Sequence, residues 1–130
     1  MNTWTFYDFL DSRGMNQIRP WLDSIPERAA AKIDARIIYM SSLRIWPEAF
    51  VSALTGYRDI FELRIAAHGS QYRPLCYYGP TRRDVTILLG ATEKGKLPRR
   101  VLDNAEKNRS VVEADNSRIE PHVFRKGSNT

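Results

Sequence analysis

The sequence has few of the residues that build cross-links and metal sites. Cys76 is the only cysteine, which excludes an intramolecular disulfide and a thiolate zinc cluster. The two histidines, His68 and His122, stand far apart in the chain, are expected to face solvent and make a poor metal site. The single cysteine favours a reducing compartment. We expect no metal and no other cofactor.

Long apolar runs are missing as well. No stretch approaches the roughly 18 apolar residues that a membrane-spanning helix needs. The first residues, MNTWTFYDFLDSRG, lack the basic segment and the long apolar stretch of a secretory signal. We therefore expect a cytoplasmic protein with no membrane partner.

Length and composition are those of one small globular domain. A chain of 130 residues with 42 % hydrophobic residues suits a single core. We expect this domain to span residues 1–125 and to be followed by a frayed tail over residues 126–130. The net charge of +5 is compatible with a polyanionic partner but does not demand one.

The first half of the chain predicts one strand and two helices. Residues 4–10 are rich in aromatic side chains and suit an opening strand. Asn16 can cap a short helix whose first turn tolerates Pro20. A longer helix is expected to reach Ile45, and its buried face repeats at steps of three and four residues: Ala30, Ile33, Ile37 and Met40. A basic stripe at helical spacing is expected to be a solvated face: Arg28, Lys32 and Arg36.

Three strands and a last helix follow. The strands fall within residues 59–91, and the last of them is nearly continuously apolar, as in a central strand. The helix spans residues 97–112, with Arg109 among its solvated positions. The fold class is therefore α+β, with a small twisted, mainly antiparallel sheet in the order strand, helix, helix, three strands, helix, and with helices packed on one face.

Two arginines flank the turn between the first two of these three strands. If the loop is the four residues 67–70, Arg64 and Arg73 lie directly opposite each other on one face, where like charges repel by up to about 1 kcal/mol. Some anion would relieve that repulsion. With a three-residue loop the two arginines lie on opposite faces, and the sequence alone leaves both registers open.

More cations follow the last strand. The segment EKGKLPRR places Lys94, Lys96, Arg99 and Arg100 at the exit of that strand. There they can converge on whatever Arg64 and Arg73 hold. The sequence thus predicts a sheet with a cationic rim.

An ordered set of short motifs extends over most of the chain. It consists of ELR at residues 62–64, Gly69, YR at residues 72–73, an apolar strand, the turn EKGKLP and a final helix. In this order and spacing the chain resembles the RelE/ParE toxin superfamily, and its phage-derived HigB-like branch most closely. The resemblance covers roughly residues 4–109.

The resemblance implies a fold, an activity and partners. It implies a RelE-like fold and a toxin of a type II toxin-antitoxin system, acting as a metal-independent, ribosome-dependent mRNA endonuclease that inhibits translation. The implied partners are the ribosome, its mRNA and a cognate helix-turn-helix antitoxin. The oligomeric state stays open.

The resemblance also suggests roles for individual residues. RNA cleavage by its own 2′-hydroxyl needs removal of that proton, stabilisation of charge on the phosphorane and a proton for the leaving oxygen. Arg64 and Arg73 are expected to hold the phosphate, and Lys94 to transfer a proton. Lys96, Arg99, Arg100 and Glu62 are expected to contact the substrate. Glu62 is also an alternative base, or a salt-bridge partner of Arg64.

Two positions depart from the family pattern. Gly90-Ala91-Thr92 stands where many HigB-like members carry a histidine or another polar group, and Pro74 replaces an apolar residue that could donate to the sheet. Two other functions stay open. One is a ParE-like toxin of the same fold that poisons DNA gyrase by protein contact. The other, which Gly90 suggests, is a degenerate prophage protein that retains only antitoxin binding.

Overall fold

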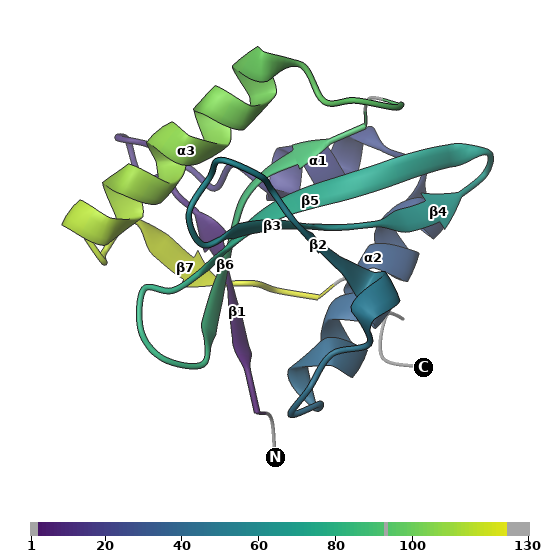
Figure 1. Ribbon diagram of the computed structural model, residues 1–130, viewed down its shortest axis with the longest axis horizontal. Helices are drawn as coiled ribbons and strands as arrows, with labels where there is room; N and C mark the ends of the chain where they lie inside the picture. The colour runs from purple at the N-terminus through teal and green to yellow at the C-terminus, as the bar shows by residue number, and fades with distance from the viewer. Residues whose placement is uncertain (1–2, 93, 125–130) are drawn as a thin grey trace.

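The structure, a computed structural model, describes residues 3–92 and 94–124 (Figure 1). The expected tail, residues 126–130, lies outside the described residues, as does residue 125. Along the chain the elements are β1 (Thr5–Phe9), α1 (Arg19–Ser24), α2 (Glu27–Ser41), the 3₁₀ turn η1 (Glu48–Phe50), β2 (Val51–Ala53), β3 (Ile60–Leu63), β4 (Ile65–Ala67), β5 (Ser70–Tyr78), β6 (Asp84–Ala91), α3 (Arg99–Ala114) and β7 (Ile119–Pro121).

Within the described residues the sheet has seven strands and is mainly antiparallel. Its order is β2-β3-β5-β6-β1-β7, and β4 pairs with β5 beside the end of β3. Only β1 and β6 run parallel among the strand pairs of the described residues. The α+β class and the mainly antiparallel sheet that the sequence predicted are confirmed.

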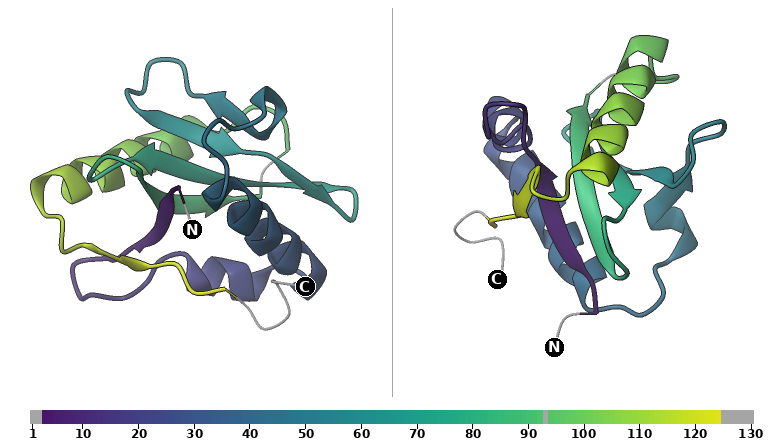
Figure 2. Two further views of the ribbon diagram at one scale, coloured as in Figure 1. Left: turned by 90° about the horizontal axis from the view of Figure 1, so that it is seen from below. Right: turned by 90° about the vertical axis from the view of Figure 1, so that its left-hand side faces the viewer.

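Helices cover both faces of this sheet. Helices α1 and α2 pack with Phe61, Leu63 and Ile65 on one face, whereas α3 packs with Leu75 and Leu88 on the other. Figure 2 shows α3 and the α1–α2 pair on opposite sides of the strands. The expectation that the helices lie on one face therefore holds for α1 and α2 only. A strand covered on both sides needs apolar residues on both sides, which explains the continuous apolar run of β6.

Helix α2 is shorter than expected and is tied to the sheet by its basic stripe. It ends at Ser41 instead of Ile45, and the indole Nε1 of Trp46 donates to the backbone oxygen of Met40, 2.9 Å away. Lys32 donates to the backbone oxygen of Ala66 at 2.5 Å, and Arg36 to that of Arg64 at 3.3 Å. Two residues of the stripe therefore bind carbonyls beside β4 instead of forming only a solvated face.

Gly90 has a packing explanation. It lies on β6 opposite Pro74, and a Cβ built on Gly90 would stand 1.9 Å from Cδ2 of the Trp21 indole. The indole Nε1 donates to the hydroxyl of Thr92 at 3.1 Å. Trp21 thus occupies the space that a side chain at position 90 would need, on the face that carries α1.

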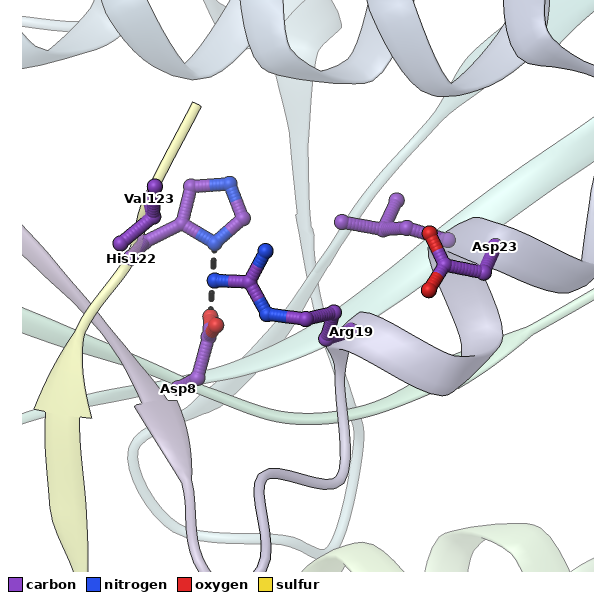
Figure 3. Close-up of a pocket in the computed structure, with 6 residues that line it drawn as sticks. Asp8, Arg19, Asp23, His122 and Val123 are labelled. Carbon is purple, nitrogen blue, oxygen red and sulfur yellow. Dashed lines mark hydrogen bonds and ion pairs between the residues drawn. The ribbon is translucent and has the colours of Figure 1, made fainter. Parts of the chain in front are cut away.

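His122 is buried between two aspartates, which corrects the expectation that it faces solvent. Its Nδ1 lies 2.7 Å from Oδ1 of Asp8 on β1, and its Nε2 lies 2.8 Å from Oδ1 of Asp34 on α2. Asn16 donates to the other oxygen of Asp8 at 2.9 Å and to Glu120 at 2.7 Å. Figure 3 shows the Asp8–His122 pair in a small pocket that Arg19 also lines. The cluster fastens the segment after β7 to β1 and α2.

Two carboxylates hold His122 in its charged form. Burial opposes the charge, but the hydrogen bonds to Asp34 and Asp8 outweigh it and raise the pKa of His122 from 6.5 to about 9. With both ring nitrogens facing carboxylate oxygens, both must donate a proton. The cluster is therefore an imidazolium clamped by two anions.

Among the described residues, no helix is both long and apolar enough to cross a bilayer.

The His122 clamp predicts a pH-dependent stability. Because the folded pKa of about 9 exceeds the ordinary 6.5, the stabilisation is complete below pH 6.5 and is lost as the pH rises through 9. We expect the free energy of unfolding to fall by on the order of 3 kcal/mol over this range, measured by urea denaturation. The His122→Gln variant should be less stable at pH 6.5 and nearly insensitive to pH up to 9. An unchanged pH dependence in this variant would contradict the clamp.

Candidate functional site: an arginine pair on a buried glutamate

Glu62 lies at the centre of the cationic residues. Strand β3 turns Phe61 and Leu63 toward α2, so Glu62 between them faces the opposite side, toward α3. Its side chain is only 1 % exposed. A carboxylate at this depth needs partners for both oxygens, and two arginines provide them.

The two arginines bind the carboxylate from neighbouring strands. Arg64 Nε lies 2.8 Å from Oε1 of Glu62. Arg73 forms a forked contact, with Nε 2.8 Å from Oε2 and Nη2 3.1 Å from Oε1. Glu62 is therefore the salt-bridge partner of Arg64, one of the roles that the sequence left open for it.

The hairpin register places Arg64 opposite Arg73. Glu62 pairs with Leu75 and Ile65 with Tyr72. Both pairs have the same register, which places Leu63 opposite Pro74 and Arg64 opposite Arg73. His68 and Gly69 form the turn with φ angles of 52° and 74°, as in a tight hairpin turn. The register with the arginines on one face is thus the observed one, and the anion that relieves their repulsion is the chain's own Glu62.

Arg73 also holds the turn after β6. It is 6 % exposed, and its Nη1 donates to the backbone oxygen of Gly95. Gly95 has a φ of 70°, a conformation that glycine adopts without strain. Arg73 therefore connects Glu62 to the segment that carries Lys94 and Lys96.

Four of the predicted site residues line one open pocket. Glu62, Arg64, Arg73 and Lys96 meet there beneath Leu102 of α3 and beside β2. The Arg64 side chain is half exposed, and Lys96 is exposed. In the part of the chain that the structure describes, the Arg64 side chain makes its one hydrogen bond through Nε, which leaves the Nη groups to face a ligand. We call this the basic pocket.

The other predicted site residues lie around the basic pocket. Lys94 lines a neighbouring open pocket with Gly69, Gln71 and other residues of the β4–β5 turn. Arg99 and Arg100 form the exposed first turn of α3. Their charge has the same sign as the positive end of the helix dipole. This end of α3 therefore favours an anionic partner.

Two other chemistries find no support in the described residues. Within residues 3–92 and 94–124, no group of three His, Cys, Asp or Glu side chains could hold a metal ion. Cys76 is buried, and burial raises the pKa of its thiol far above the ordinary value. A thiolate nucleophile is therefore not expected here.

Arg109 is a buried charge, which corrects the prediction from the sequence that it is solvated. It is 7 % exposed and bonds Glu106 and Glu113 on its own helix. The hydrogen bonds to these carboxylates raise the pKa of Arg109 further above its ordinary value. Its position four residues after Ala105 and three before Val112 puts it on the buried stripe of α3. That spacing could have identified it from the sequence.

A comparison with models of known protein families identifies the family of this chain. The model of a family described as "Phage derived protein Gp49-like" matches residues 20–110. The chain belongs to the Gp49-like family. This family is associated with toxin-antitoxin systems and is related to RelE-like toxins. Searches of curated proteins and of solved structures found no match.

The family match includes the whole basic pocket. Residues 20–110 contain Glu62, both arginines and Lys96. Strands β1 and β7 lie outside the matched range, so His122 and Asp8 do too. The His122 clamp thus fastens flanking segments of this Gp49-like protein to the part that the family shares.

The Glu62–Arg73 contact predicts a stability difference between the two arginines. Arg73→Ala removes the forked partner of a buried carboxylate and should lower the free energy of unfolding by about 3–5 kcal/mol. Arg73→Lys should recover only part of it, because an ammonium cannot reproduce the planar fork. Arg64→Ala, at the exposed side, should cost about 1 kcal/mol or less. Urea denaturation measures all three, and equal losses for Arg64→Ala and Arg73→Ala would contradict this assignment.

Proposed function

We propose that this Gp49-like protein is the toxin of a type II toxin-antitoxin system and that it cleaves mRNA on the ribosome, as HigB-like toxins of the RelE group do. The observation that carries the proposal is the basic pocket. In it a buried carboxylate holds Arg64 at a fixed place beside Lys96. The family's association with toxin-antitoxin systems supports the same function.

The basic pocket suits the charge that develops during RNA cleavage. The 2′-oxygen attacks the neighbouring phosphorus, the bond to the 5′-oxygen breaks, and a 2′,3′-cyclic phosphate and a 5′-hydroxyl result. Negative charge accumulates on the phosphoryl oxygens at the transition state. Arg64, preoriented by Glu62, and Lys96 would stabilise that charge without reorganisation.

The residues have different tasks in this mechanism. Arg73 is buried against Glu62 and the Gly95 carbonyl, so we assign it positioning of Arg64 and Lys96 instead of direct phosphate contact. Glu62 anchors both arginines and is not assigned the role of base. Lys96 shares the pocket with Arg64 and can protonate the leaving oxygen. Lys94, in the neighbouring pocket, is the candidate for removing the 2′-hydroxyl proton.

The cationic start of α3 extends the same surface. Arg99 and Arg100 follow the lysine-bearing turn directly and are exposed. Phosphates on either side of the cleaved bond would neutralise them, and such contacts hold a nucleic acid without reading its sequence. Codon preference then depends on the ribosome-bound message rather than on these two arginines.

The alternative functions have weaker support. Poisoning of gyrase by protein contact does not require Arg64 and Lys96 to share a pocket. Gly90 suggested a degenerate protein, but it faces Trp21 on the α1 side of the sheet. Arg73 faces the α3 side. Gly90 therefore does not mark a catalytic group missing from the basic pocket.

The cleavage proposal predicts a specific mRNA pattern. Induction of the chain in bacteria should produce new 5′ ends inside translated codons, which primer extension maps. Arg64→Ala should reduce these ends by about 100-fold, as loss of one donor to a developing oxyanion does. Purified enzyme added to programmed ribosomes should leave 5′-hydroxyl ends at the same codons.

Arg82→Ala is the matched control for this experiment. Arg82 is an exposed arginine in the turn before β6, outside the basic pocket, so its removal should leave the cleavage unchanged. Growth arrest with intact messages would instead refute the nuclease and direct the work to gyrase. Cleavage that Arg64→Ala and Arg82→Ala reduce equally would refute the assignment of the site.

The toxin proposal also predicts a neutralising partner. A small open reading frame beside the gene should encode a helix-turn-helix antitoxin, and its co-expression should restore growth after induction. The two proteins should then co-purify. Arrest that persists with the neighbouring product present, or a neighbourhood without such a frame, would count against the toxin-antitoxin assignment.

A further inference from the structure

A partly exposed group of mainly aromatic side chains lies beside the start of β1. It gathers side chains from the start of β1, the end of α2, the connection to β2 and the end of β5: Trp4, Tyr39, Ile45, Trp46, Phe50 and Tyr78. Figures 1 and 2 show the beginning of β1 and the α2–η1 connection side by side. We call these six residues the aromatic surface.

The aromatic surface exposes much apolar area. Ile45 is 86 % exposed, Tyr39 52 % and Tyr78 43 %. Among the described residues, the other large hydrophobic side chains with comparable exposure are those of Met15 and Val123. Apolar side chains gathered in one place on the surface of a small protein mark an interaction site more often than isolated ones do.

The rings of this surface are already packed against one another. The ring centroids of Trp4 and Trp46 are 4.7 Å apart, and Tyr78 stacks at 5.9 Å on Trp46 and at 4.2 Å on Phe61. The faces of these rings are therefore covered in part by neighbouring rings. Nucleic-acid bases need free ring faces for stacking, so a protein partner fits this surface better than single-stranded RNA.

The surface is also held in place before any partner arrives. The Trp46 indole donates to the Met40 carbonyl at the end of α2, and Tyr39 meets Phe50 edge to face at 6.0 Å. A surface whose side chains are ordered in advance loses less entropy on binding. These contacts would therefore favour a stable complex.

Cations border the apolar area. The guanidinium carbon of Arg36 lies 3.9 Å from the centroid of the Phe50 ring, and that of Arg83 lies 5.4 Å from the Trp4 ring. Arg44 precedes Ile45 directly and is exposed, and Glu48 is the acidic residue of this connection. The border is therefore mainly positive. Two copies of a chain with net charge +5 would bring like charges together here.

We propose that the aromatic surface is a docking site for an acidic, amphipathic helical segment of a partner protein. Apolar side chains of that segment would cover Ile45, Tyr39 and the edges of the packed rings. Its carboxylates would pair with Arg36 and Arg83. The packed rings lie on the α2 face of the sheet, whereas the basic pocket lies on the α3 face, so this docking does not depend on the proposed RNA cleavage.

Peptide binding tests this proposal without RNA. The probes are a helical peptide of leucine and glutamate in amphipathic order, the same composition in scrambled order, and the leucine–lysine counterpart. Tryptophan fluorescence of the full chain should report binding of the acidic amphipathic peptide at least ten-fold tighter than that of the other two. Ile45→Asp, at an exposed position, should weaken this binding ten-fold or more.

Met15→Asp is the matched control, because Met15 is exposed but lies outside the aromatic surface. It should leave the peptide affinity unchanged. Equal binding of the amphipathic and scrambled peptides, or equal weakening by Met15→Asp and Ile45→Asp, would overturn the proposal. Two further results would overturn the proposal. One is a dimer in sedimentation that Ile45→Asp abolishes. The other is binding of a single-stranded RNA oligomer that Ile45→Asp abolishes. Ribosome-dependent cleavage that remains while peptide binding fails would refute the docking site alone.

Discussion

The basic pocket depends on the burial of one carboxylate. Glu62 is enclosed by the sheet and α3, and its two oxygens bind Arg64 and Arg73. An anion at this depth is stable only while its partners stay in place. Because the buried carboxylate requires both arginines as partners, it also keeps their two like charges on one face of the hairpin, where they would otherwise repel. The result is an exposed guanidinium with a defined position and a positive surface that does not require a bound ligand for its order.

A second buried ionic cluster serves a different purpose. His122 joins β1, α2 and the segment after β7 through Asp8 and Asp34. Strands β1 and β7 lie outside residues 20–110, the part that matches the Gp49-like family. The flanking strands are thus secured by charge as well as by the β1–β6 and β1–β7 pairings. Since the two clusters lie on opposite faces of the sheet, titration of His122 bears on stability more than on the basic pocket.

Much of the architecture followed from local patterns. Alternation along Phe61, Leu63 and Ile65 identified the strands. The sequence left the hairpin register open, and the structure has the register that places Arg64 opposite Arg73. The sequence did not predict which side of the sheet α3 covers, because an apolar stripe on a helix does not indicate which face of the sheet it packs against. The short edge strands β2 and β7 were missed for a related reason. They contain three residues each and owe their conformation to their neighbours.

By itself the sequence determined the α+β class, the set of candidate cations and the resemblance to RelE-like toxins, since hydrophobic period and motif order are local properties of a chain. Only the tertiary structure decided which cations meet. It buried Arg73, exposed Arg64 beside Lys96, placed Lys94 in a neighbouring pocket and enclosed His122 between two aspartates. These outcomes depend on strand register and on the faces that the helices cover. Both are set by contacts between residues far apart in the sequence.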